Sequence, residues 1–179
     1  MFKKILIAIA IIVVVFVVVV ALQPSEFSVT RSETMAAAPE TVFAQVNDFY
    51  KWRAWSPWEK IDPELERTYE VEPAGTGAVY SWVGNSDVGE GSMTITESRP
   101  SELIRIKLEF IKPMAGTSDT EFTFKPDGAG TAVTWTMSGT NNFLSKAICL
   151  FMNMDEMIGG QFEEGLANLK SVVETEEAQ

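Results

Sequence analysis

An uninterrupted apolar run near the N-terminus constrains the fold of this chain more than any other feature. From Ile5 to Leu22 the sequence reads ILIAIAIIVVVFVVVVAL, without one polar side chain. As an α-helix this run would be about 27 Å long, close to the roughly 30 Å of hydrocarbon in a bilayer. We therefore predict a single N-terminal transmembrane helix.

A retained anchor and a cleaved signal peptide are the two interpretations of this run. It is longer than the usual apolar region of a signal peptide, about 7–15 residues, and no A-x-A cleavage site follows it. Both observations favour the anchor. Lys3 and Lys4 precede the run, so the positive-inside rule predicts a cytoplasmic N-terminus. The domain would then lie on the outer, periplasmic or extracytoplasmic side of the cell membrane.

The composition of residues 23–179 excludes several functions. This part carries all 25 acidic residues but only 12 of the 14 basic ones, because Lys3 and Lys4 lie before it, so its net charge is −13. Nucleic-acid binding normally requires a basic face, so we expect no nucleic-acid partner. The chain has no histidine and one cysteine, Cys149. Ser-His-Asp and Cys-His catalysis are therefore excluded, and we expect neither a metal nor a cofactor.

Alternation of apolar and polar residues predicts a β-sheet. A first alternating segment, 26–35, precedes a short helical region that begins near Pro39 and ends at Ser56-Pro57. Turn signals such as Asp127-Gly128 separate six further segments. These six are 66–72, 77–84, 91–98, 103–110, 119–125 and 131–139. Such alternation indicates an antiparallel sheet with one apolar face and one polar face.

A long helical segment from about Leu144 to Val173 completes the domain. Its apolar residues recur at helical spacing, and Gly159-Gly160 predicts a kink or break. The economical packing is an α+β fold in which a curved antiparallel sheet of about six or seven strands wraps around this helix, with two short helices after the first strand. The chain thus divides into an anchor with a short linker (1–25), a domain (26–173) and an acidic, frayed tail (174–179).

The order of elements resembles the helix-grip SRPBCC superfamily, which includes START lipid-transfer domains, polyketide cyclases and the birch-pollen allergen. The resemblance rests on APETVFAQVNDFYKWRAWSPW, YSWVGNSDVGEGSMTI, GTAVTWTMSG and DEMIGGQFEEGLANLK, spread over residues 26–173. Within the superfamily the chain is similar to membrane-anchored, polyketide-cyclase-like bacterial proteins. The resemblance implies an apolar pocket between sheet and helix that binds lipids, steroids or aromatic compounds. A minority of members are enzymes, and the oxygenase branch needs histidine-held metal, which this sequence cannot supply.

Large aromatic, aliphatic and methionine side chains on the predicted apolar faces are candidates for the lining of such a pocket. The same residues suit a filled core, and the pattern alone leaves both possibilities open. The candidates are Trp55, Trp58, Tyr80, Trp82, Met93, Ile95, Phe110, Phe122, Phe124, Trp135, Met137, Phe151, Met154 and Ile158.

A tryptophan cluster, WRAWSPW at residues 52–58, holds three of the five tryptophans. We interpret it as an aromatic plug between the short helices and the sheet, with Trp55 or Trp58 at the rim of the pocket. Membrane contact is the alternative, because tryptophan favours interfaces. Nearby and helical carboxylates are interpreted as solvated charges, since such residues are rarely buried. They are Asp48, Glu59, Asp62, Asp155 and Glu156.

The sequence therefore favours a membrane-tethered binding module for a hydrophobic small molecule or lipid. No catalytic residue is identified, and the lack of a nucleophile–base pair favours binding over catalysis. One alternative is a polyketide cyclase- or dehydratase-like enzyme that works through pocket shape and a few polar groups. The other is a non-catalytic envelope protein, structural or interacting, with a filled core.

Overall fold

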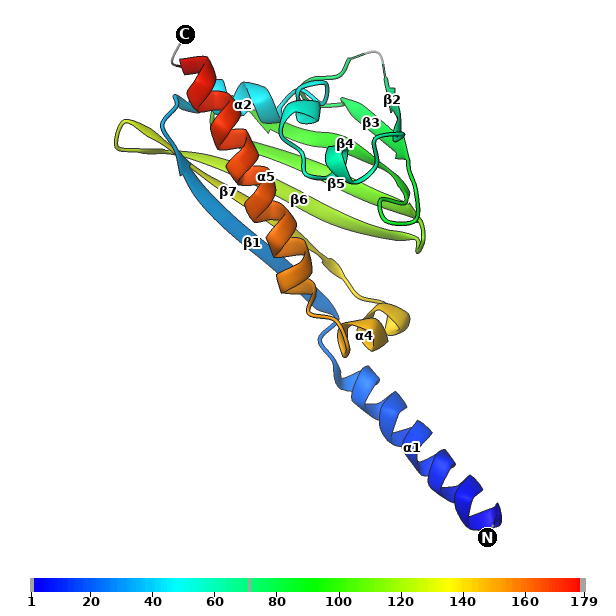
Figure 1. The fold of residues 1–179 in the computed structure, drawn as a ribbon. Coiled ribbons are helices and arrows are strands. Elements are labelled where there is room, and N and C mark those ends of the chain that lie inside the picture. Colours follow the sequence, from blue (N-terminus) through cyan, green and yellow to red (C-terminus); the bar gives the residue numbers. More distant parts are fainter. Residues whose placement is uncertain (1, 71, 178–179) are drawn as a thin grey trace.

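Seven strands form one antiparallel sheet in the order β1-β7-β6-β5-β4-β3-β2 (Figure 1). The structure is a computed structural model that describes residues 2–70 and 72–177. In chain order the strands are β1 (Glu26–Met35), β2 (Glu66–Tyr69), β3 (Val79–Val83), β4 (Glu90–Arg99), β5 (Leu103–Lys112), β6 (Gly116–Asp127) and β7 (Gly130–Thr140).

The predicted alternation produces the two faces of the sheet. In β7 the side chains of Thr131, Val133, Trp135 and Met137 are buried, whereas those between them are only partly covered. β1 has the predicted bounds, while β2 ends at Tyr69, earlier than the predicted segment 66–72. Val71, which alternation assigns to the apolar face, lies outside the described residues. The antiparallel sheet of a helix-grip fold is thus confirmed.

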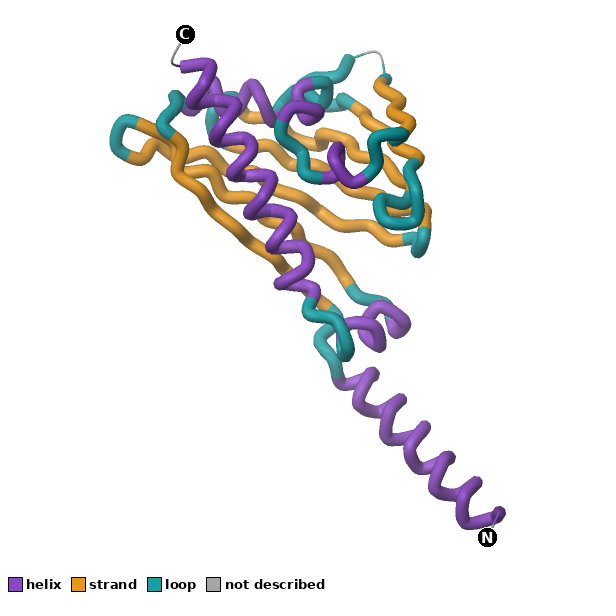
Figure 2. The backbone as a smooth tube through the Cα atoms, viewed as in Figure 1, coloured by secondary structure: helices purple, strands orange, loops and turns teal. Residues whose placement is uncertain are grey.

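One long helix, α5 (Met154–Glu177), crosses the inner face of the sheet and packs on β1 (Figure 2). The helix has buried side chains along its length, among them Phe162, Leu166, Leu169 and Val173. They recur every three or four residues, so they occupy one side of the helix. The predicted long C-terminal helix is therefore present.

The predicted break at Gly159-Gly160 is wrong, because α5 runs through both glycines without interruption. The helical segment is instead divided earlier, between α4 (Phe143–Cys149) and α5. Asn153 causes this division, since its side-chain oxygen accepts the N–H of Glu156 at 3.3 Å and so caps the start of a new helix.

The C-terminal residues 174–177 do not form the frayed tail predicted for 174–179, because α5 continues to Glu177. The carboxylate of Glu174 accepts the backbone N–H of Ala36 at 2.8 Å. The carboxylate of Glu177 accepts the hydroxyl of Thr41 at 2.6 Å. These bonds hold the last turn of the helix against the start of α2; residues 178–179 lie outside the described part.

The short helices after β1 are α2 (Pro39–Val46), the 3₁₀ turn η1 (Lys51–Ala54) and α3 (Trp58–Ile61). Trp52 and Trp55 are buried and 4.6 Å apart between ring centroids. Their indole N–H groups donate to the carbonyls of Val46 (2.8 Å) and Gln45 (3.3 Å). Both rings also contact Trp135 of β7. The two tryptophans thus join α2 and η1 to the sheet.

The N-terminal helix α1 (Phe2–Leu22) extends away from the domain (Figure 1). It is long and apolar enough to cross a membrane. Val20, near its end, is its one buried residue. The helix is therefore consistent with a single-pass membrane anchor.

Candidate ligand-binding site

Most of the predicted pocket residues form the hydrophobic core. The largest group is at most 8% exposed and consists of Trp55, Tyr80, Trp82, Ile95, Phe122, Phe124, Trp135 and Met137. Trp135 is central among them, with its ring centroid 4.0 Å from that of Phe162 and 4.7 Å from that of Phe122. The core continues from Trp135 beneath the short helices, where Phe124 contacts Phe43 of α2.

A second group of predicted residues is only half-buried, at the edge of the hydrophobic core. It comprises Trp58, Met93, Phe110 and Ile158, which pack against the core without being fully covered. Leu108, which the sequence analysis did not select, has the same environment and lies opposite Met93 in the sheet. Large apolar side chains therefore remain partly uncovered on β4 and β5.

The third group, Phe151 and Met154, lines a pocket at the end of the domain next to α1. The pocket has a volume of about 500 Å³, within the range of about 300–1,000 Å³ of ligand sites. Its lining is Gln23, Pro24, Glu26, Phe27, Asn141, Lys146, Cys149, Leu150, Phe151, Met152, Asn153 and Met154. The segment between α4 and α5 that the sequence analysis did not foresee supplies much of this wall.

Another pocket, of about 560 Å³, lies at the opposite end of α5. It is lined by Gln45, Tyr50, Lys51, Arg53, Ala54, Val172 and Glu176. Three of these side chains carry a charge, so this pocket is less suited to an apolar ligand than the first.

A row of inner-face residues connects the first pocket with the half-buried group. Gly139 of β7 lies opposite Phe27 on one side and Ser118 on the other. Ser118 in turn lies opposite Leu108, which pairs with Met93. Directly opposed residues share a face of the sheet, so the row crosses the inner face from the pocket wall to β4. A Cβ at Gly139 would lie 2.9 Å from the ring of Phe27, so glycine lets that ring lie over the strand.

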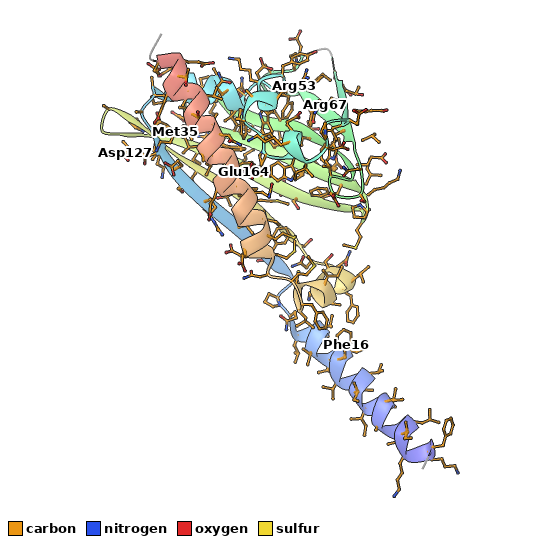
Figure 3. The ribbon with its side chains drawn as sticks, viewed as in Figure 1. Phe16, Met35, Arg53, Arg67, Asp127 and Glu164 are labelled. Atoms are coloured by element: carbon orange, nitrogen blue, oxygen red, sulfur yellow. The ribbon has the colours of Figure 1, made fainter. Side chains whose placement is uncertain are left out.

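A polar cluster lies beyond the far end of this row, on α3, β2 and β3. Arg67 donates through Nε to Glu59 Oε2 at 2.8 Å, and Tyr80 donates its hydroxyl to Glu59 Oε1 at 3.4 Å (Figure 3 labels Arg67). Burial raises the pKa of Tyr80, and the charge of Glu59 raises it further. The phenol therefore stays neutral at physiological pH and acts as a hydrogen-bond donor.

Two of the carboxylates interpreted as solvated charges are in fact largely covered. Glu59 is paired with Arg67, and Asp62 accepts the backbone N–H groups of Asn85 (2.7 Å) and Glu64 (3.0 Å). Asp155 and Glu156 are exposed, as expected. The pairing of Glu59 had no signal in the sequence, because Arg67 comes from a strand whose position depends on the whole sheet.

Comparison with known proteins agrees with this architecture. Residues 26–174 match the family described as polyketide cyclase / dehydrase and lipid transport. No curated protein sequence is significantly similar to the chain.

Several solved structures have a similar fold. A protein from Chromobacterium violaceum aligns with a TM-score of 0.61 and 17% identity, over 82% of this chain and 96% of that one. The Aha1 dimer from Colwellia psychrerythraea aligns with a TM-score of 0.60 and 13% identity, over 83% and 96%. Ara h 8.0201 aligns with a TM-score of 0.56 and 9% identity, over 83% and 97%. At such identities the likeness concerns the fold alone.

The family match covers almost the whole domain, and the fold agrees with it element by element, from β1 to α5. This chain therefore belongs to the polyketide cyclase / dehydrase and lipid transport family, within the helix-grip SRPBCC superfamily.

Proposed function

We propose that this protein is a membrane-tethered module that binds a hydrophobic small molecule or lipid on the inner face of its sheet. The observation that carries the proposal is the row from Phe27 to Met93, which links the pocket of about 500 Å³ to partly uncovered apolar side chains. Covering such side chains with an apolar ligand gains roughly 25 cal/mol per Å² removed from water.

The tether in this proposal is α1, which is not cleaved from the mature protein. The protein is thus a membrane-anchored member of the superfamily. Its apolar surface is exposed along nearly its whole length, and only Gln23, Pro24 and Ser25 separate it from β1. The domain is therefore held against the membrane. Lys3 and Lys4 orient the helix with its N-terminus in the cytoplasm and the domain on the outer side.

The ligand class follows from the side chains along the row. Met93 and Leu108 offer adaptable apolar surface, while the hydroxyl-bearing Ser118 is a buried polar residue in the middle of the row. A ligand with a long or flat apolar body and few polar groups fits this arrangement.

Photo-crosslinking tests the proposal on the full chain in nanodiscs. A fatty acid that carries a diazirine is expected to label β4, β5 and the start of α5, and excess unlabelled fatty acid should suppress this labelling. Labelling of α1 by bulk lipid should resist the competitor. Labels confined to α1 would overturn the binding proposal.

A cyclase- or dehydratase-like enzyme is the second candidate, and the polar cluster favours it. The neutral hydroxyl of Tyr80 can donate a hydrogen bond to a ligand carbonyl in place of Glu59. Incubation with a poly-β-carbonyl compound would then yield a product lighter by one water. Tyr80→Phe should abolish that product while leaving ligand binding intact; an unchanged compound would exclude this activity for the substrate tested.

A further inference from the structure

The segment from Phe143 to Met152, here called the α4 segment, exposes an unusual number of large apolar side chains. Phe143, Leu144, Phe151 and Met152 are 51%, 57%, 79% and 46% exposed. The single charged residue of the segment is Lys146, although the domain as a whole is strongly acidic. Several large apolar side chains exposed within ten residues indicate a contact with a membrane or a partner.

The α4 segment lies against the end of α1 (Figure 1). This contact fixes the position of the α4 segment along the axis of α1. The ring of Phe151 stacks on Phe16 of α1, with centroids 6.5 Å apart and planes at 25° (Figure 3 labels Phe16). Val20 of α1 is fully buried at the same junction. Through Phe151, the α4 segment therefore contacts the last two turns of α1.

The contact between Phe16 and Phe151 indicates how deep the α4 segment lies in the membrane. Phe16 precedes Leu22 by six residues, which corresponds to about 9 Å along a helix that rises 1.5 Å per residue. The 21 residues of α1 give a length of about 30 Å, close to the thickness of the hydrocarbon core. If α1 fills that core, Leu22 lies near its edge and Phe16 lies about 9 Å inside, with the ring of Phe151 stacked against it. Interfacial helices bury their apolar face to a similar depth, about 5–10 Å.

We propose that the α4 segment is embedded in the leaflet of the membrane nearest the domain, as a second membrane contact beside α1. This inference rests on the proposed membrane tether. A lipid bilayer is the occupant because exposed Phe151 contacts an apolar residue of α1 itself, while Asn142 and Asn153 flank the exposed apolar residues. Lys146 is long enough to reach lipid phosphate from this position.

The membrane contact has a consequence for the bound ligand. Cys149, Leu150, Phe151 and Met152 line the pocket of about 500 Å³. With the α4 segment embedded, this pocket opens at the bilayer, and the row from Phe27 to Met93 begins there. A hydrophobic ligand can thus enter this pocket from the bilayer without crossing water.

Depth-dependent quenching tests the inference on the full chain. Cys149 is the single cysteine, so Cys149→Ser gives a background in which Val13→Cys, Leu144→Cys, Phe151→Cys and Asp127→Cys each carry an environment-sensitive fluorophore. The labelled chains are placed in nanodiscs of phosphatidylethanolamine and phosphatidylglycerol with spin-labelled lipids. Asp127, at the hairpin far from α1 (Figure 3), is the matched aqueous control.

Labels at positions 144 and 151 are expected to lose most of their fluorescence to quenchers on the upper part of the acyl chains. The label at position 13 should lose it to quenchers deep in the bilayer, and the label at position 127 should keep it. If position 13 is quenched but 144 and 151 behave like 127, the tether stands and the inference is overturned. If position 13 also behaves like 127, the tether itself is overturned, and the inference with it.

Discussion

The indole of Trp135 in β7 lies parallel to the ring of Phe162 in α5, with centroids 4.0 Å apart and planes 9° apart. Both residues are almost fully buried, so the stack fixes α5 on the sheet. Gly165 allows this approach, because a Cβ there would lie 2.9 Å from the indole ring of Trp135. The position of α5 in turn decides which inner-face residues are covered and which remain available to a ligand.

Phe162→Ala is expected to lower the free energy of unfolding by about 3–5 kcal/mol, because it leaves a cavity against Trp135. Denaturant unfolding of the full chain in detergent, followed by tryptophan fluorescence, measures the loss. Met157→Ala is the matched control: this side chain, in the same helix, is 47% exposed, so its removal should cost less than about 0.5 kcal/mol. Equal losses for the two variants would contradict the described packing.

The adjacent glycines of α5 are expected to respond differently to alanine. A Cβ at Gly160 meets no atom within 4 Å, whereas a Cβ at Gly159 would lie 2.0 Å from Nη2 of Arg31. Gly160→Ala should therefore stabilise the protein by about 0.5–1 kcal/mol, the usual gain in a helix interior. Gly159→Ala should gain less, because it displaces Arg31 from Asp155 and Glu163.

A double-mutant cycle isolates the cause of that difference. In an Arg31→Ala background no guanidinium obstructs Gly159, so both alanine substitutions should stabilise equally in denaturant unfolding. A difference that persists in this background would show that something other than Arg31 limits the space at Gly159.

The two glycines also show where sequence reasoning succeeds and fails. Alternation alone predicts the strands, and for β1 even the bounds, because a half-buried strand needs one apolar face. The glycine pair predicts a helix break that the structure places at residues 150–153. Asn153, followed three residues later by Glu156, is a capping pattern that would have located the break correctly.

The candidate site is harder to predict than the fold. Half-burial of Met93 and Phe110 depends on how the rest of the chain packs over the sheet, and the row that begins at Phe27 depends on strand register. Neither the half-burial of these residues nor the strand register can be predicted from short stretches of sequence. A side chain's hydropathy is the same in a filled core and in a pocket wall. Only the resemblance to a family of known fold pointed to a pocket.

The Tyr80 hydroxyl is expected to make the protein less stable at high pH. Burial raises the pKa of Tyr80 above its ordinary value, so the unfolded state loses this proton first. The free energy of unfolding should therefore fall as pH rises above about 10. Unfolding curves measured across this range check the slope, and Tyr80→Phe should flatten it. An equally steep decline in the variant would assign the effect to other groups.

Native mass spectrometry of the full chain, released from nanodiscs made with a cell lipid extract, tests the binding of an apolar ligand most directly. We expect an apolar species bound to the wild type, lost in Met154→Trp, which narrows the pocket beside α1. It should persist in Ala54→Trp, which puts a tryptophan in the pocket at the other end of α5. A chain without bound species, or identical adducts in all three proteins, would contradict a ligand on the inner face of the sheet.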